Sequence, residues 1–400
     1  MNEPHSSLQP ATLITHAGRP KGCKVTVNPV VARTSTVVFD SMATLREAVA
    51  GRARHETGLV YGRKGSPTGE SLEAVICALE GGHRSRLFSS GLAAITCAIL
   101  SVVRSGDHVL VVDSCYEPVR KFCVQYLQQM GVDCSFFQPD LSDLKAKIRP
   151  NTRLIWTESP GSILFEMCDL PALVALAKAH DNVVVAVDNT WGSGLMYCPL
   201  RLGADISVIA ATKYLVGHSD VMLGAVTTNQ NRWTALADMG DLLGHCVSPD
   251  DAYLALRGVR TLSVRMRQQQ DTALQVAQWL QKQALISTVF YPALPDDPGH
   301  AIWKRDFSGA NGLLSCEFRT DVSAQAVDAF VETLQLFGIG HSWGGYESLA
   351  LPVSPAAVRS LSHWQGRGNV VRLHVGLEDP ADLIHDLQTA LARLGEGLAG

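Results

Sequence analysis

The sequence predicts an α/β fold: a large domain with a mainly parallel sheet, followed by a smaller α+β domain. Three observations predict this fold. In the middle of the 400-residue chain, short β-branched apolar segments alternate with segments of helical periodicity. These apolar segments are continuous rather than alternating, as in strands that are buried on both faces of a parallel sheet. Beyond about residue 256 the alternation ends, and longer helical segments replace it.

In chain order, the first 60 residues read as an extended arm with one short helix near 42–50. The large domain is expected to span 61–256. Its predicted strands are 108–112, 153–157, 183–187, 206–210 and 223–227. One predicted helix, 91–103, is nearly apolar. In the other, 169–180, four apolar residues fall on one face: Leu170, Leu173, Val174 and Ala177.

The C-terminal domain, 257–400, begins with a long helix that has one polar face. The remaining elements predicted in it are a strand at 313–318, a helix at 322–337, a strand at 371–375 and a helix at 381–394. The last helix has leucines at helical spacing, namely Leu383, Leu387, Leu391 and Leu394. A chain of 400 residues is long enough for two or three such units.

Composition and charge narrow the classes of function. Hydrophobic residues make up 46% of the chain and charged residues 18%, which indicates a well-packed globular protein rather than a disordered one. The net charge of −4 comes without a block of Lys and Arg, so no nucleic-acid partner is expected. The N-terminal segment lacks the features of a secretory signal, and no apolar run reaches the roughly 18 residues that cross a bilayer. We therefore expect a cytoplasmic protein with no membrane partner.

The ten cysteines are scattered, and no two of them are spaced as in C-x-x-C. Several lie in apolar segments, where a free thiol behaves as a small buried hydrophobe. A chain of this size does not depend on disulfides, so we expect reduced thiols. Zinc ligands normally come in close pairs, and no metal site is expected.

Three segments of the large domain carry polar groups where α/β proteins bind ligands. Lys213 follows an apolar strand, where burial and neighbouring cations can hold an amine near neutrality, as a Schiff-base lysine requires. Alone, it would more often be an ordinary lysine at a strand end. Asp188 ends the preceding strand, at the edge where open sheets bind ligands. The turn at 89–91 opens directly into a helix, whose free N–H groups suit a phosphate.

The order of these three features, phosphate turn, aspartate and lysine, is much more specific than any one of them. Further motifs are ITHAGR (14–19), YGRKGSPTGESLE (61–73), SSGLAA (89–94), YEPVR (116–120), ESPGS (158–162), DNTW (188–191), ATKYLVGHSD (211–220), LRGVRTLSVR (256–265), SWGGYESL (342–349) and VRLHVGLED (371–379). These motifs are distributed over almost the whole chain. In them, the sequence resembles the Cys/Met-metabolism family of pyridoxal-phosphate enzymes, of fold type I.

The resemblance implies pyridoxal 5′-phosphate as the cofactor and assigns roles by position. Lys213 is implied to bind the cofactor covalently and Tyr116 to stack on its ring, and these two are the implied catalytic residues. Asp188 is implied to hold the pyridine nitrogen protonated, which makes the ring a better electron sink. The implied phosphate ligands are the N–H groups of Gly91 and Leu92 and the hydroxyl of Thr212. The implied substrate-binding residues are Arg372, as a clamp on the α-carboxylate, with Ser342, Trp343 and Tyr253.

The resemblance also implies an oligomer. Tyr61 and Arg63 match a pair that reaches the cofactor phosphate of a neighbouring subunit, so the arm at 1–60 is expected to contribute to that subunit. The implied assembly is a homotetramer made of two dimers. The chain departs from the family at Ala210, where many relatives have a serine, so one phosphate hydroxyl would be missing.

Two segments favour the bacterial cystathionine β-lyase branch of the family. Segment 342–349 carries Trp343 and Tyr346, and Tyr116 is followed by Glu117-Pro118. This branch implies a sulfur amino acid as the substrate and β-elimination as the reaction, with homocysteine, pyruvate and ammonia as the products. Lys213 would take the α-proton and help to protonate the departing thiolate.

Two alternatives remain open at this point. Pocket residues change specificity easily, so γ-elimination or γ-replacement, as in cystathionine γ-lyase, cystathionine γ-synthase or methionine γ-lyase, is the nearer one. A regulatory protein that keeps the cofactor fold is the other, because a fold does not prove an activity. A nicotinamide-binding enzyme is excluded, since no predicted strand is followed by G-x-G-x-x-G.

Overall fold

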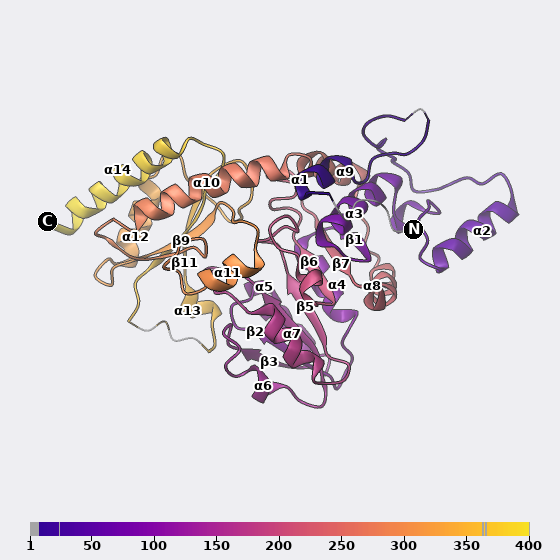
Figure 1. The fold of residues 1–400 in the computed structure, drawn as a ribbon, viewed down its shortest axis with the longest axis horizontal. Helices are drawn as coiled ribbons and strands as arrows, with labels where there is room; N and C mark the ends of the chain where they lie inside the picture. Colours follow the sequence, from indigo (N-terminus) through magenta and orange to yellow (C-terminus); the bar gives the residue numbers. More distant parts are fainter. Residues whose placement is uncertain (1–7, 24, 362–363, 365, 400) are drawn as a thin grey trace.

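A computed structural model describes residues 8–23, 25–361, 364 and 366–399 of the chain. Its large domain contains a seven-stranded sheet in the order β1-β7-β6-β5-β4-β2-β3 (Figure 1). The strands are β1 (Arg84–Phe88), β2 (His108–Val112), β3 (Asp133–Phe137), β4 (Thr152–Glu158), β5 (Val184–Asp188), β6 (Ile206–Ile209) and β7 (Gly224–Thr228). Neighbouring strands among β2 to β6 are parallel, whereas β7 is antiparallel to both of its neighbours. The prediction of a mainly parallel sheet is therefore confirmed.

Helices pack against this sheet and bury its apolar strands. The longer ones are α3 (Pro67–Glu80), α4 (Gly91–Leu100), α7 (Leu170–Lys178) and α8 (Gln230–Leu242), and a further helix, α9 (Pro249–Val259), packs on α3. Shorter ones are α5 (Glu117–Lys121), which continues as a π-helical turn (Phe122–Leu127), and α6 (Leu144–Lys147). Every residue of β2, β5, β6 and β7 is buried, as expected from their continuous apolar sequences. The four residues predicted to form the apolar face of α7 are buried as well.

The C-terminal part forms a second sheet of five strands in the order β10-β11-β12-β9-β8. These strands are β8 (Ile286–Phe290), β9 (Leu313–Phe318), β10 (Gly338–Ile339), β11 (Leu349–Val353) and β12 (Val370–His374). The helices of this part are α10 (Leu262–Leu280), α11 (His300–Asp306), α12 (Ala324–Thr333), α13 (Pro355–Val358) and α14 (Pro380–Ala399). The four predicted leucines of α14 are buried, which confirms its apolar face. One apolar core continues from the large sheet into this smaller one.

The N-terminal segment has little core of its own. It contains α1 (Pro10–His16), which packs against α3, and α2 (Met42–Ala53). In Figure 1, α2 lies at the opposite end of the molecule from α14. Several apolar side chains around it face solvent, most of all Val38, which is 90% exposed. The predicted helix near 42–50 is confirmed, and the part of the predicted arm at 1–7 lies outside the described residues.

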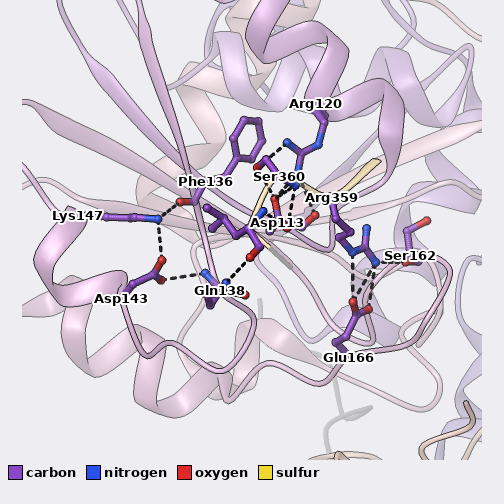
Figure 2. A network of polar contacts seen from close by, with 11 residues as sticks. Asp113, Arg120, Phe136, Gln138, Asp143, Lys147, Ser162, Glu166, Arg359 and Ser360 are labelled. Atoms are coloured by element: carbon purple, nitrogen blue, oxygen red, sulfur yellow. Dashed lines mark hydrogen bonds and ion pairs between the residues drawn. The ribbon is translucent and has the colours of Figure 1, made fainter. Parts of the chain in front are cut away.

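Polar contacts join the C-terminal part to the large domain (Figure 2). Asp113, directly after β2, accepts hydrogen bonds from the backbone N–H of Ser360 (2.9 Å), from its hydroxyl (2.6 Å) and from Arg120 (2.6 Å). Arg359 forms an ion pair with Glu166 at 3.1 Å. These contacts fix the segment around residue 360 against the loops that follow β2 and β4.

Metal and membrane features are absent from the part of the chain that the structure describes. Within it, no three His, Cys, Asp or Glu side chains come together as metal ligands. None of its helices is both long enough and apolar enough to cross a membrane. All ten cysteines are free thiols, and five of them are buried: Cys97, Cys115, Cys123, Cys168 and Cys316. Cys23 and Cys246 are exposed, so the prediction of core thiols holds for only part of the set.

Candidate active site

The candidate site lies at the carboxyl edge of the large sheet. Glu158 and Asp188 end the neighbouring parallel strands β4 and β5 and stand opposite each other in register. Lys213 lies four residues beyond the end of the next strand, β6. Since parallel strands end at the same edge of a sheet, side chains distant in sequence meet here, at the place where open α/β sheets bind ligands.

Lys213 is half-buried, and its amine is held by a residue of the C-terminal part. Its Nζ donates a hydrogen bond to the hydroxyl of Ser342 at 2.6 Å. The same nitrogen lies 5.4 Å from the centre of the Trp343 ring, within reach of a cation–π interaction. Burial, together with the positive charge of Arg372, lowers the pKa of Lys213 to about 8. A weakly basic amine is what the sequence led us to expect at this position.

Asp188 is buried and partly satisfied by its own chain. The backbone N–H of Thr190 donates to Oδ1 at 3.0 Å, and its hydroxyl donates to the same oxygen at 2.6 Å. The Thr190 oxygen in turn accepts a hydrogen bond from the N–H of Ala210, which connects the end of β5 to the end of β6. Burial raises the pKa of Asp188, while the two bonds from Thr190 oppose this rise. Both bonds end on Oδ1, so Oδ2 remains available for a cationic partner.

The N-terminus of α4 lies against the end of β6. Ser90 caps the helix by accepting a hydrogen bond from the N–H of Ala93 at 3.1 Å. The N–H groups of Gly91 and Leu92 are in the first turn, where a helix provides no partner of its own. A Cβ placed on Gly91 would lie 2.5 Å from the Cβ of Ala210, so only glycine allows this approach. The phosphate turn predicted from the sequence is therefore brought close to the lysine segment.

The Thr212 hydroxyl is occupied within its own chain. It accepts a hydrogen bond from the N–H of Leu223 at 2.8 Å and donates to the carbonyl of the same residue at 3.2 Å. One lone pair of the oxygen remains for a further donor. Its predicted role at the phosphate stays a prediction, since the hydroxyl proton already has an acceptor.

Tyr116 begins α5 at the same edge of the sheet. Its N–H donates to the carboxylate of Glu158 at 2.6 Å, and its side chain is about half exposed. Burial raises the pKa of Tyr116, and the charge of Asp188 raises it further, whereas that of Arg372 lowers it. A half-exposed aromatic ring at this edge of the sheet can stack on a flat ligand.

Arg372 lies in β12 and is largely buried, which lowers its pKa. Its Nη2 donates to the carbonyl of Ser342 at 3.4 Å, the one hydrogen bond of its guanidinium within the described residues. Most of its donors are therefore free to bind a carboxylate in a bidentate manner.

Three predicted site residues are not joined to this group. Arg63 donates to the carbonyl of Asp241 in α8 at 3.3 Å, and Tyr61 pairs with Thr36 through a β-bridge. Tyr253 is half-buried on α9. No hydrogen bond or ion pair found in the described part of the chain connects these side chains to Lys213 or Asp188. Tyr61 and Arg63 were expected to act across a subunit boundary, which a single chain does not contain.

The sequence analysis missed two residues that shape the site. Glu158 was recognised only as part of a motif, although its position was informative: it is a carboxylate at the end of an apolar strand, as Asp188 is. Burial raises its pKa well above the usual value, and the charge of Asp188 adds to this effect. Thr190 gave no signal of its own, since only the fold shows that its hydroxyl links Asp188 to Ala210.

These features together fit pyridoxal 5′-phosphate. A weakly basic lysine can bind an aldehyde, and a buried carboxylate with a free oxygen can hold a protonated pyridine nitrogen. The free N–H groups of a ten-residue helix can bind a phosphate. Each group was found in its own segment, and the fold brings all three together.

Comparisons with known proteins agree with this chemistry. The family described as Cys/Met metabolism PLP-dependent enzyme matches residues 11–392. The cystathionine beta-lyase of Bordetella avium is 48% identical, covering 96% of this chain and 97% of its own. Cystathionine beta-lyase MetC of Escherichia coli (strain K12) is 41% identical, covering 96% and 98%.

A structure search points to the same fold. The crystal structure of metB from Corynebacterium glutamicum superposes with a TM-score of 0.88 at 30% sequence identity, covering 98% of this chain and all of the other. This likeness confirms the expected fold type I architecture, and the sequence comparisons confirm the expected cofactor class. The chain belongs to the Cys/Met metabolism family of PLP-dependent enzymes.

Proposed function

We propose that this enzyme catalyses β-elimination on cystathionine, which breaks a carbon–sulfur bond and gives homocysteine, pyruvate and ammonia. The observation that carries the proposal is the weakly basic amine of Lys213, held by Ser342 beside the Trp343 ring. The choice of substrate and of the bond broken is supported by the relatives named cystathionine beta-lyase, which are 40–48% identical over nearly their whole length.

The residues have separate roles in this proposal. Bound pyridoxal 5′-phosphate supplies an electron sink for the negative charge that remains when the α-proton is removed. Arg372 binds the substrate α-carboxylate and so orients the α-proton toward Lys213. The Lys213 amine takes this proton and returns it to the departing sulfur, which a group with a pKa of about 8 can do in both directions near neutral pH.

Other residues hold the cofactor or shape the pocket. Asp188 keeps the pyridine nitrogen protonated through its free oxygen, and Tyr116 stacks on the ring. The N–H groups of Gly91 and Leu92 bind the phosphate, and the Thr212 hydroxyl joins them by turning its proton from the Leu223 carbonyl to a phosphate oxygen. Trp343 and Tyr253 line the side of the pocket that receives the departing thiol.

We also propose an assembly in which the arm of one subunit completes the site of the next. The apolar side chains that surround α2 face solvent in the single chain. Packing against a second copy would remove this apolar surface from water. Tyr61 and Arg63 would then reach the neighbouring phosphate. Two such dimers would form a homotetramer of cytoplasmic enzyme, with subunits divided into an arm at 1–60, a cofactor domain at 61–256 and a C-terminal domain at 257–400.

Analysis of the keto acid tests the reaction. Purified protein loaded with pyridoxal 5′-phosphate is incubated with cystathionine, and the keto acid is identified by chromatography and mass. Pyruvate together with homocysteine is expected.

The same assay decides between this proposal and its alternatives. The cystathionine gamma-lyase of Sus scrofa is 35% identical over 95% of this chain, so γ-elimination is the second candidate. Formation of 2-oxobutyrate and cysteine would establish that reaction instead. A loaded protein that forms no keto acid from any sulfur amino acid would point to a regulatory role.

A further inference from the structure

His374 lies in β12, two residues after Arg372, and is buried with 1% of its surface exposed. Both nitrogens of its ring are bonded to the backbone of one loop. Nε2 lies 2.9 Å from the N–H of Gly344, and Nδ1 lies 3.0 Å from the carbonyl oxygen of Glu347. The ring therefore spans the loop that follows Ser342.

The two partners determine the protonation state of the ring. A backbone N–H can only donate, so Nε2 must accept from Gly344. A carbonyl can only accept, so Nδ1 must carry the proton that bonds to Glu347. A second proton on Nε2 would break the bond to Gly344. The charged groups that face the ring are the cations Arg372 and Lys213, and burial together with these cations lowers the pKa of His374 to about 3, so it stays neutral.

The loop held in this way carries the groups that contact Lys213. Ser342 accepts the hydrogen bond from the lysine amine and adopts φ +104°, a conformation that is costly for a residue with a side chain. Gly344 has φ +89°, and a Cβ placed on it would lie 2.8 Å from the carbonyl carbon of Lys213. A loop in an unfavourable conformation and in such close contact needs strong support from its surroundings.

Other side chains bind the loop backbone on both sides of Gly344. Before it, Arg372 donates to the carbonyl of Ser342 at 3.4 Å. Gln269 donates to the carbonyl of Gly345 at 2.7 Å, and Glu378 accepts from the N–H and the hydroxyl of Ser348. Among the described residues, two side-chain bonds to the loop backbone flank Trp343: that of Arg372 to Ser342 and that of His374 to Gly344, which is the shorter at 2.9 Å. The ring of Tyr214, the residue after Lys213, lies between the rings of Trp343 and His374, at 5.4 Å from Trp343 and 6.0 Å from His374.

We propose that His374 is a positioning residue: by accepting a hydrogen bond from Gly344 it holds Ser342 and Trp343 against Lys213 and so keeps the lysine amine buried. It does not touch the reacting atoms. The inference rests on the proposed role of Lys213 as the reactive amine, but its first test requires neither cofactor nor turnover.

The test uses three substitutions that separate the two bonds of the ring. In His374→Gln, the amide reaches the position of Nε2 and can accept from Gly344. In His374→Asn, the shorter amide reaches only the position of Nδ1 and keeps the bond to Glu347. His374→Leu removes both bonds. The matched control is His108→Leu, which removes another buried histidine with two hydrogen-bond partners, Thr152 and Ser135, at the other end of the strands.

The first readout is the pH dependence of Lys213 acetylation in the apoprotein, measured by peptide mass spectrometry. Loss of the Gly344 bond lets water reach the amine, so the midpoint should rise by about one pH unit in His374→Asn and in His374→Leu. In His374→Gln it should stay near that of the unchanged protein, as in His108→Leu. In the loaded enzyme, kcat should fall about tenfold in the same two variants and recover in His374→Gln.

Three results would overturn the inference: an unchanged midpoint in folded His374→Asn, an equal rise in His374→Gln, or an equal rise in the control. Should His374→Leu fail to fold, the contrast between the asparagine and glutamine variants decides the question. Failure of the proposed reaction is recognised separately, because it would leave the acetylation midpoints intact while cystathionine gave no pyruvate.

Discussion

The amine of Lys213 is weakly basic because of its position rather than its chemistry. The side chain is half-buried, its Nζ lies beside the ring of Trp343, and the charge of Arg372 acts on it. Both conditions favour the neutral amine. The same conditions lower the free energy of unfolding when the lysine is protonated, so this loss of stability depends on pH.

This loss of stability gives a first prediction. The folded chain lowers the pKa of Lys213 from 10.5 to about 8, so between these values the unfolded chain binds more protons, and stability must rise with pH. Lys213→Met removes the effect. The difference in unfolding free energy between the variant and the unchanged apoprotein should shrink by about 2 to 3 kcal/mol from pH 7 to pH 10. Urea unfolding at both pH values measures it, and a difference that does not change with pH would contradict this view of the lysine.

Asp188 gives a second prediction at the same scale. In Asp188→Asn, an amide oxygen can still accept both bonds from Thr190, so the fold should persist. The negative charge that holds the pyridine nitrogen protonated is lost, and kcat should fall by about two orders of magnitude. Steady-state kinetics measures the fall, with circular dichroism as the control for folding. Activity within a factor of two of the unchanged enzyme would show that Asp188 does not serve the ring.

Among the elements, the contact of α4 with the end of β6 brings the phosphate turn to the lysine. Gly91 allows this contact because it has no Cβ, and Ala210 is the residue that it meets. A side chain at position 91 would therefore separate the start of α4 from the end of β6.

This contact can be tested by a pair of substitutions. Gly91→Ala should push the helix N-terminus away from β6 and weaken cofactor binding by about tenfold, because the N–H groups no longer converge on the phosphate. Adding Ala210→Gly removes the opposing Cβ and should restore part of the affinity. Titration of the apoproteins with pyridoxal 5′-phosphate gives the dissociation constants. Equal affinity in the double and the single variant would show that the two Cβ atoms do not oppose each other.

The elements also show which parts of the fold a sequence can predict. The central strands and the α14 leucines follow apolar patterns, and both were located within a few residues. Helix α3 was missed although its signals are present: a Ser66 cap, a proline in the first turn and Gly81 in a left-handed conformation at the end. Strand β1 could not be found in this way, because Arg86 is buried in it and is satisfied by Asp241, a partner more than 150 residues away.

The residues of the site also differ in how far the sequence predicts their roles. Asp188 ends one apolar strand and Lys213 lies four residues beyond the next, so their positions and their chemistry could be predicted together. The bond from Lys213 to Ser342 connects residues 129 positions apart, and no local pattern encodes it. The functions expected for Tyr61 and Arg63 involve a second chain, and the resemblance to a family was the only source of that expectation.

At the scale of the whole molecule, two parts of the chain must keep a fixed relative position, because both contribute residues to the site. The large domain provides Lys213 and Asp188, and the C-terminal part provides Ser342 and Arg372. The contacts of Asp113 with Ser360 join these parts, and Arg120, from the large domain, binds both residues (Figure 2). Asp113 is 1% exposed, and its hydrogen bonds lower its pKa although burial alone would raise it.

Asp113→Ala should therefore destabilise the protein by about 3 kcal/mol, since it leaves Arg120 largely buried without its ion-pair partner. A matched control is Asp133→Ala, which removes an exposed partner of Arg149 at 3.4 Å and should cost less than about 1 kcal/mol. Urea unfolding of both variants gives the comparison. Equal losses would mean that the buried contact adds nothing to the connection between the two parts.

The central claim is that Lys213 is the residue that carries the cofactor. The most direct measurement is to load the protein with pyridoxal 5′-phosphate, reduce it with borohydride so that the cofactor stays attached to its lysine, and map the modified peptide by mass spectrometry. The label should be found on Lys213. A label on another lysine, with Lys213 unmodified, would contradict the account.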